Sequence, residues 1–454
     1  MKLSVILSVR DGLAYTQQCI EVLREYELSS CEFIVVDNGS LDGTAEWLRS
    51  QRDLTVIQGS ADWGIACAYN EGRKKAMGEK LLFLHNDVVC SRDVIPAMMK
   101  VLDFDGVAAA GPFTNRCKYG KQFIQPEAYE TLEEFQEVAG KISHGGKDIA
   151  VNAALCLEGF CLMVESAAFD EVGGFDNRFA RSGYESIDLS FRLIQAGYWL
   201  CDVSVYVHHG ERNTVTDDFY SKEEDEKEQN VFQNKWGVNL TYSGDIRHSL
   251  LKYIDVHRPD LSVLDLGCAL GGNLMYLKWR NRNAALYGVE LNPCAAAIAK
   301  HFGSVMVADV ESIDFEAFIG QFDYVIAGDL IEHLKNPWGF VKQIAGVLKP
   351  QGEFLVSIPN VAHISNIYQL LRGYWEYTDA GLLDKTHLRF FTRTMIFRMF
   401  EEAGFRIVAC EYNKVHIPDS MQKLFNVLIT LPEFPIEKEN LEAFQIFVRG
   451  KKIS

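Results

Sequence analysis

The chain has 454 residues, of which 48% are hydrophobic and 24% charged, and its formal net charge is −17. A chain of this length is too long for a single hydrophobic core, so we expect two domains or three. The acidic charge argues against a nucleic-acid partner, because binding a phosphate backbone requires a basic surface, but it does not exclude small phosphorylated ligands.

The first 210 residues alternate short β-branched runs with amphipathic stretches. We expect buried parallel strands over residues 2–9, 32–37, 54–57 and 80–87, with helices over 13–26 and 65–77. This alternation predicts a doubly wound α/β sheet. Ligands in such sheets bind beyond the carboxyl ends of the strands.

Several of these strand ends carry side chains that suit a ligand. Asp37 ends the second strand, where it could accept a hydrogen bond from a nucleobase imide, and Gly64 lets a helix approach a ligand closely. Asp87 follows the fourth strand, a place suited to a divalent cation on a diphosphate. His208 and His209 end a later strand, and one of them could complete the metal site. Each residue taken alone is more often structural.

The order of these motifs resembles the family 2 glycosyltransferases of the GT-A fold, in particular rhamnosyltransferase-type members, over about residues 1–215. The matching segments are SVILSVRDGLAYTQQCIEVL for the opening strand and helix, VDNGSLDGT for the nucleotide-binding turn, LLFLHNDV for the Asp-x-Asp metal motif and VHHG for the C-terminal histidine motif. The resemblance implies a nucleotide sugar held by Val9, Asp37, Gly64 and Asp87, and a glycan or lipid-linked glycan acceptor. It also implies Mn²⁺ or Mg²⁺ on Asp87, His208 and His209.

Two positions depart from the family pattern. His85 stands at the first acid of the metal motif, which leaves Asp87 as its only carboxylate. GGFDNRFARSGYESIDLSFRLIQAGY resembles the catalytic-base region, which usually reads Glu-Asp-x-Asp-Leu with the second acid as base, but here Ser186 takes that place. Glu185 and Asp188 are three residues apart and share a face if the segment is helical, so either could replace the missing base. Alternatively, both merely cap the helix.

A domain boundary follows this first unit. The charged run over 222–228 predicts a helix with a solvated face that closes the unit, and the turn-rich stretch NKWGVNLTYSGD comes next. We therefore expect one domain over 1–242 and a second over 243–454. The strands expected in the second domain are 262–267, 285–290, 305–309, 322–329, 352–359, 405–410 and 444–450. We expect the last two to form an antiparallel closing pair.

Four consecutive strands of the second domain end in acids. Asp265 ends the strand before the glycine-rich stretch GCALGG, where a backbone free of Cβ atoms can approach a ligand. Glu290 ends the next strand, where a carboxylate can accept from both hydroxyls of a ribose; Asp309 is placed to reach an adenine amine. Asp329 follows the fourth strand. Each acid alone is more often a turn former or a helix cap, but together they indicate a nucleoside-containing cofactor.

This half resembles the class I S-adenosylmethionine-dependent methyltransferases over about residues 249–451, and especially the branch found with bacterial polysaccharide genes. The motifs include VLDLGCALGG, GVELNP, FDYVIAGDLIEHLKNPWGFVKQIAGVLKPQGEFLVSIPNVAH and GLLDKTHLRFFT. The resemblance implies a Rossmann-like seven-stranded sheet with an antiparallel last strand. It places the cofactor against Asp265, Gly267, Cys268, Gly271, Glu290, Asp309, Val310 and Asp329. An acid after the second strand argues against NADP, whose extra phosphate requires an arginine there.

Methyl transfer to a hydroxyl needs a base near neutral pH, and histidine is the natural choice. The candidates are His333, His363 and His387, of which we favour His363 and His387 together. The alternative for each is a histidine that makes one structural hydrogen bond.

These motifs predict a bifunctional enzyme of bacterial surface-polysaccharide biosynthesis, which adds a sugar to a glycan and methylates a sugar hydroxyl. The alternative is a methyltransferase whose inactive GT-A domain only binds carbohydrate or nucleotide sugar, and a third possibility is that the domains act on unrelated substrates. Eleven cysteines without a C-x-x-C pair fit a reducing cytoplasm. No apolar run approaches the roughly 18 residues of a membrane helix, so we expect peripheral membrane contact at most.

Overall fold

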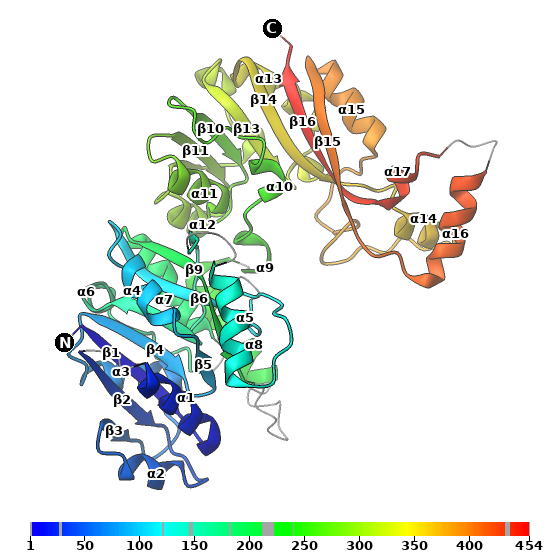
Figure 1. Cartoon of the computed structure of the whole chain (residues 1–454). Coiled ribbons are helices and arrows are strands. Elements are labelled where there is room, and N and C mark those ends of the chain that lie inside the picture. Colours follow the sequence, from blue (N-terminus) through cyan, green and yellow to red (C-terminus); the bar gives the residue numbers. More distant parts are fainter. Residues whose placement is uncertain are drawn as a thin grey trace. The chain divides into compact units, whose positions relative to one another are not determined.

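The computed structural model of the chain describes residues 2–26, 30–119, 122–144, 149–180, 183–210, 222–238, 240–431 and 436–453. The chain folds into two compact units, Met1–Ser243 and Gly244–Ser454, which we call the N-terminal and the C-terminal unit (Figure 1). No helix among the residues just given is long and apolar enough to span a membrane.

The N-terminal unit is an α/β domain around a mixed sheet. Its strands are β1 (Leu3–Val9), β2 (Cys31–Asp37), β3 (Leu54–Gln58), β4 (Lys80–His85), β5 (Val88–Cys90), β6 (Val107–Thr114), β7 (Val151–Ala153), β8 (Cys161–Glu165) and β9 (Trp199–His209). Its helices are α1 (Leu13–Glu25), α2 (Thr44–Ser50), α3 (Ile65–Arg73), α4 (Val94–Val101), α5 (Leu132–His144), α6 (Ser166–Glu171), α7 (Tyr184–Gln195), α8 (Lys222–Trp236) and α9 (Leu240–Ser243).

The sheet of the N-terminal unit has the order β3-β2-β1-β4-β8-β6-β9-β5, and β7 pairs with β9. Strands β1 to β4 are parallel, as the alternating pattern predicts, because a helix connects each of them to the next. In register, Val9 lies beside Asp37, and Ser8 lies beside His85. The carboxyl ends of the three central parallel strands therefore meet at one edge of the sheet.

The C-terminal unit is a second α/β domain. Its strands are β10 (Ser262–Leu266), β11 (Ala285–Glu290), β12 (Ser304–Val307), β13 (Phe322–Gly328), β14 (Leu348–Pro359), β15 (Phe405–Lys414) and β16 (Ala443–Lys452). Its helices are α10 (His248–Leu251), α11 (Gly272–Arg280), α12 (Pro293–Ala299), α13 (Pro337–Val347), α14 (Ile364–Leu371), α15 (Arg393–Glu402), α16 (Asp419–Thr430) and α17 (Lys438–Glu442), with short 3-10 helices η1 (Val310–Ser312), η2 (Phe315–Phe318) and η3 (Ile331–His333).

The sheet of the C-terminal unit has the order β12-β11-β10-β13-β14-β16-β15. Strands β15 and β16 form the expected antiparallel pair, and β16 also runs antiparallel to β14. Strand β12 ends at Val307, so Asp309 lies in the turn before η1 instead of at the strand end. Both α/β domains and the seven-stranded sheet are thus confirmed.

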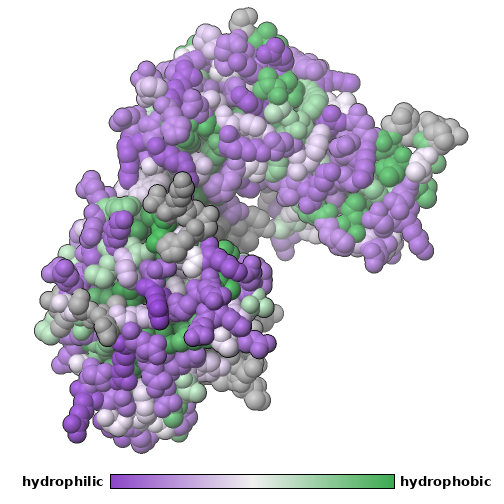
Figure 2. Space-filling view, in the orientation of Figure 1, coloured by the Kyte–Doolittle hydropathy of each residue, from purple (hydrophilic) through white to green (hydrophobic). Residues whose placement is uncertain are grey.

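A small hydrophobic cluster extends the C-terminal unit beyond its sheet. Ile364 of α14, Phe425 of α16 and Leu441 of α17 pack together there. Figure 2 shows hydrophobic surface on this part of the unit, where Leu371 and Val427 are 67% and 55% exposed.

Candidate active sites

Three potential metal ligands converge at the edge of the N-terminal sheet. The ligating atoms of His85, Asp87 and His209 lie within 4.8 Å of one another, and Asp87 Oδ1 is 3.6 Å from His209 Nε2. His209 Nδ1 lies 2.9 Å from the carbonyl oxygen of Arg116, so donation of its N–H there leaves the Nε2 lone pair facing Asp87. Two imidazoles and a carboxylate suit a divalent transition ion. Of the two ions that the sequence predicts, this donor set fits Mn²⁺ better than Mg²⁺, which prefers oxygen ligands.

His208 does not join this cluster. Successive side chains of a strand project from opposite faces of the sheet, so the side chains of His208 and His209 lie on different faces. Its Nδ1 lies 2.6 Å from the hydroxyl of Tyr129, and the two rings pack edge to face. The structure instead adds His85, which sequence reasoning missed as a ligand. Its place at the first acid of the metal motif was the signal that could have found it.

The residues predicted to hold the nucleotide organise the turns beyond β1 to β3. Asp37 is fully buried; its Oδ1 accepts from the backbone N–H of Ser40 at 2.9 Å and its Oδ2 from the side-chain amide of Gln58. The backbone N–H of Asn38, the residue after Asp37, donates to the carbonyl oxygen of Val9 at 2.7 Å. Gly64 has φ +78°, and a Cβ there would lie 2.6 Å from the Ala180 Cβ, so this position requires glycine.

Glu185 lies in the first turn of α7 as a buried acid with a spare oxygen. Its side chain is 2% exposed, and its Oε2 has no hydrogen-bond partner among the described residues. Burial raises the pKa of Glu185 to about 7, with a further upward contribution from Glu228 and Glu158 and an opposing one from Lys118. A carboxyl that titrates near neutral pH is suited to general-base catalysis.

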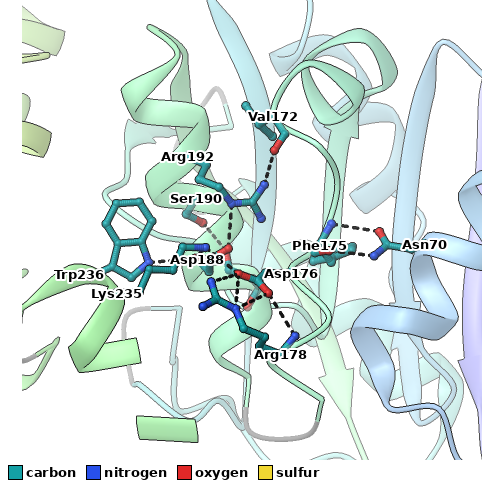
Figure 3. Close-up of polar contacts among 11 residues, drawn as sticks. Asn70, Val172, Phe175, Asp176, Arg178, Asp188, Ser190, Arg192, Lys235 and Trp236 are labelled. Carbon is teal, nitrogen blue, oxygen red and sulfur yellow. Dashed lines mark hydrogen bonds and ion pairs between the residues drawn. The ribbon is translucent and has the colours of Figure 1, made fainter. Parts of the chain in front are cut away.

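Asp188, one turn further along α7, is in the opposite situation (Figure 3). Its Oδ2 pairs with the Arg192 guanidinium at 2.8 Å. Its Oδ1 pairs with the Lys235 ammonium at 2.5 Å and accepts from the Trp236 indole N–H at 2.9 Å. The side chain is fully buried. Asp188 thus ties α7 to α8, and both of its oxygens are occupied by cations or the indole, so the expectation that it serves as a base does not suit this geometry.

The glycine-rich loop after β10 has the conformation that its residues predict. Gly267 and Gly271 have φ of +71° and +82°, and a Cβ on Gly271 would lie 2.9 Å from the Ala299 Cα, so α11 can pass α12 only with glycine there. Asp265 is buried and accepts from the Asn273 side chain at 3.1 Å. Burial raises the pKa of Asp265 to about 7.

Glu290 connects this loop to the next strand end. Its Oε2 accepts from the backbone N–H of Ala269 at 2.8 Å, and its Oε1 accepts from that of Asn292 at 2.8 Å. The carboxylate therefore lies directly beside the glycine-rich loop. Cys268 turns its thiol into the core, where Gly288 leaves room for the sulfur, so only its backbone faces the loop.

The remaining predicted cofactor residues lie at two neighbouring strand ends. Asp309 caps η1 by accepting from the Glu311 N–H at 2.9 Å, and Val310 is buried behind it. Asp329 has φ +52°, and its carboxylate pairs with Arg247 at 2.8 Å and accepts from the Ser357 hydroxyl at 2.8 Å. Asp265, Glu290, Asp309 and Asp329 thus lie at or just beyond the carboxyl ends of four parallel strands, which meet at one edge of the sheet.

The two favoured histidines are not brought together. His363 caps α14: its Nδ1 hydrogen-bonds with the Ser365 hydroxyl at 2.8 Å, and burial lowers its pKa to about 4. His387 instead packs against His333, with ring centroids 4.9 Å apart. No ring contact or hydrogen bond joins His363 to His387 in the part of the chain described. The buried Glu332, which the sequence did not single out, lies beside His333 and His387.

Comparison with protein-family models gives one match in each unit. A model described as "Glycosyl transferase family 2" matches residues 4–156, and a model described as "Methyltransferase domain" matches residues 239–410.

Individual relatives cover single units. A ubiquinone biosynthesis O-methyltransferase of Burkholderia pseudomallei is 28% identical over 185 residues, which are 38% of this chain and 78% of that protein. A solved mannosyltransferase of Pyrobaculum calidifontis in complex with GDP-Man and Mn²⁺ is similar at 19% identity and a TM-score of 0.33, over 47% of this chain and 58% of that one. A solved methyltransferase of Archaeoglobus fulgidus gives 18% identity and a TM-score of 0.34, over 49% and 99% of the two chains.

Proposed function

We propose that the chain is a bifunctional transferase of glycan assembly, because one of its units matches a glycosyl transferase family 2 model and the other a methyltransferase domain model. The N-terminal unit would transfer a sugar from a nucleotide sugar to a glycan. The C-terminal unit would transfer a methyl group from S-adenosylmethionine to a hydroxyl of that glycan. Joining the two activities raises the effective concentration of one unit's product at the other.

The observation that carries the first activity is the contrast between Glu185 and Asp188. Inverting sugar transfer needs a base for the acceptor hydroxyl on the side opposite the leaving nucleotide. Glu185 has a buried oxygen without a hydrogen-bond partner among the described residues and a pKa of about 7, whereas Asp188 is held by two cations. We infer that Glu185 accepts the proton and that Ser186, at the family's usual base position, has no direct part.

The His85–Asp87–His209 cluster would hold a divalent ion in this reaction. Such an ion neutralises the charge that develops on a departing diphosphate. His85 and His209 are the last residues of β4 and β9, and Asp87 lies in the turn between β4 and β5. Asp37 and Gly64 organise the neighbouring turns, where the nucleotide would lie.

In the C-terminal unit, the chain's part in methyl transfer is to bind and align. The left-handed backbone at Gly267 and Gly271 allows close approach of the cofactor, and Glu290 lies where a ribose would be held. S-adenosylmethionine carries its own leaving group, so alignment and exclusion of water supply most of the acceleration.

Aromatic side chains beside His387 support a sugar as the methyl acceptor. The ring centroids of Trp375 and Phe390 are 5.4 Å apart, and those of Phe390 and His387 are 6.4 Å apart. Trp375 and Tyr377 remain 38% and 58% exposed. Exposed aromatic faces offer a platform for the apolar face of a sugar ring. A phenolic lipid could use the same surface, and the name of the Burkholderia relative makes that the alternative acceptor.

A second candidate for the N-terminal unit is a binding module without sugar-transfer activity, which Ser186 favours. Thermal-shift measurements with nucleoside diphosphates, with and without Mn²⁺, separate the two. We expect Mn²⁺-dependent stabilisation by one nucleotide that is lost in Asp87→Ala, because a ligand that binds only the folded state raises the melting temperature. Stabilisation by a glycan, together with indifference to every nucleotide, would favour the binding module.

A further inference from the structure

A buried carboxylate lies in η3, shortly after the end of β13. Glu332, in η3, is 1% exposed, and neither of its carboxylate oxygens has a hydrogen-bond partner among the described residues. A buried, unpaired carboxylate is costly, and native structures usually satisfy such groups with a partner or an ion. Ligating atoms of Glu332, His333 and His387 lie within 4.8 Å of one another. The unpartnered carboxylate therefore faces two imidazoles.

The hydrogen bonds of the two imidazoles leave their Nε2 atoms available. His333 Nδ1 lies 3.2 Å from the carbonyl oxygen of Thr386, and His387 Nδ1 lies 3.2 Å from that of Leu382. Donation of each Nδ1–H to a carbonyl leaves the Nε2 lone pair exposed for a ligand. This is the arrangement by which proteins orient metal-binding histidines.

Backbone hydrogen bonds hold the two segments of the cluster together. The N–H groups of Leu388 and Arg389 donate to the carbonyl oxygen of Glu332, at 2.9 and 3.0 Å. The Arg389 guanidinium donates to the carbonyl oxygen of Lys335 at 2.7 Å. The turn that carries Glu332 and His333 is thus fixed against the segment that carries His387, so the three ligands are positioned by the fold.

We propose that Glu332, His333 and His387 form a divalent metal site in the C-terminal unit. Two imidazoles and one carboxylate match Mn²⁺, Fe²⁺, Co²⁺ or Zn²⁺ better than Ca²⁺ or Mg²⁺, which prefer oxygen ligands. Three protein ligands leave coordination positions for an oxygen of a substrate. Asp384 adds negative charge close by, because its carboxylate accepts from Thr386 and interacts with both imidazoles.

The place of this cluster suggests what the ion does, on the premise of the proposed methyl transfer. A Cβ on Gly267 of the cofactor loop would lie 3.5 Å from Leu330, two residues before Glu332, so the cluster is next to the loop. A bound ion would take the acceptor hydroxyl as a ligand and lower its pKa, and the proton would pass to water. The acceptor oxygen then bonds to the methyl carbon, the carbon–sulfur bond breaks with its electrons left on sulfur, and S-adenosylhomocysteine departs.

Metal analysis of the full chain after equilibrium dialysis against Mn²⁺ or Zn²⁺ tests the site. The background is Asp87→Ala, which removes the carboxylate of the N-terminal cluster. We expect His387→Gln or Glu332→Gln in that background to lose one bound ion per chain. The matched control is His257→Gln, which changes an exposed histidine of the same unit and should lose none.

Equal ion content in the His387→Gln, Glu332→Gln and control proteins would overturn the metal site. Binding of S-adenosylhomocysteine, measured on the same samples, shows that each variant is folded and separates this failure from failure of the proposed function. A variant that loses one bound ion but still binds S-adenosylhomocysteine supports the metal site. Unchanged ion content with tight S-adenosylhomocysteine binding contradicts the site but leaves the methyltransferase assignment standing.

Discussion

Both units contain a buried carboxyl whose pKa rises to about 7, but the two groups are placed for different tasks. Oε2 of Glu185 in the N-terminal unit has no hydrogen-bond partner among the described residues, whereas Asp265 in the C-terminal unit accepts from Asn273 beside a glycine-rich loop. The cause of the shift, burial, is the same in both. The hydrogen bond that Asp265 accepts and the open oxygen of Glu185, rather than the raised pKa itself, therefore separate the tasks of these two carboxyls.

The largest expected effect is on sugar transfer. Replacing Glu185 by glutamine keeps the size of the side chain but removes its ability to take a proton, so the rate of sugar transfer should fall by about 10²–10⁴-fold. Initial rates with a nucleotide sugar and a glycan acceptor measure this. Methyl transfer should be unchanged, and the exposed control Glu133→Gln should keep full activity. A normal rate of sugar transfer in Glu185→Gln would contradict the role of Glu185 as the general base.

Replacing Asp188 by asparagine should lower the stability of the N-terminal unit. Asparagine at this position removes the buried counter-charge of Arg192 and leaves Lys235 paired with Asp176 alone. Removing one partner of a buried ion pair costs about 3–5 kcal/mol. Urea unfolding of the N-terminal unit, followed by tryptophan fluorescence, measures the loss. Glu185→Gln should not destabilise the unit at pH 8. An Asp188→Asn protein with unaltered stability and no sugar transfer would reverse the assignments of the two acids.

The C-terminal unit should lose cofactor affinity without losing sugar transfer. Alanine at Glu290 or Asp265 removes a carboxylate that borders the cofactor loop, and hydrogen bonds to charged groups contribute about 1.5–3 kcal/mol. We expect S-adenosylhomocysteine to bind about 10- to 100-fold more weakly by calorimetry, at 1.4 kcal/mol for each factor of ten. Unchanged affinity in both variants would place the cofactor elsewhere.

The smallest effect is on the dependence of stability on pH. The folded pKa of Glu185, about 7, lies above the usual value of a free glutamate, so protonated Glu185 favours the folded state. Its contribution is full below the unfolded pKa and is lost as the pH rises towards about 7. The N-terminal unit should therefore lose stability between these values, and Glu185→Gln should flatten that slope in unfolding experiments. Sugar transfer should increase over the same range, as Glu185 loses its proton.

The sheets could be predicted from sequence because local patterns encode them. Residues 2–9 and 262–267 alternate with helical stretches, and the glycines at 267 and 271 mark a turn that needs positive φ. The alternation of side chains along a strand also separates His208 from His209, so the choice between them was within reach of the sequence.

Contacts between distant segments could not be predicted in this way. Asp188 is neutralised by Lys235, which belongs to a helix whose charged sequence indicates only a solvated face. His387 meets Glu332 and His333 because a long connection after β14 folds back onto η3. His363 follows a strand end in the expected way, but local capping of α14 uses its ring.

The central claim is that one chain adds a sugar and methylates it, and mass spectrometry of the glycan product tests this directly. The protein would be incubated with isotope-labelled S-adenosylmethionine, a panel of nucleotide sugars and glycan acceptors, and a phenolic lipid as competitor. We predict a glycan that gains one sugar and one labelled methyl group in place of a hydrogen. A label found only on the phenolic lipid, with no sugar added to any acceptor, would contradict the account.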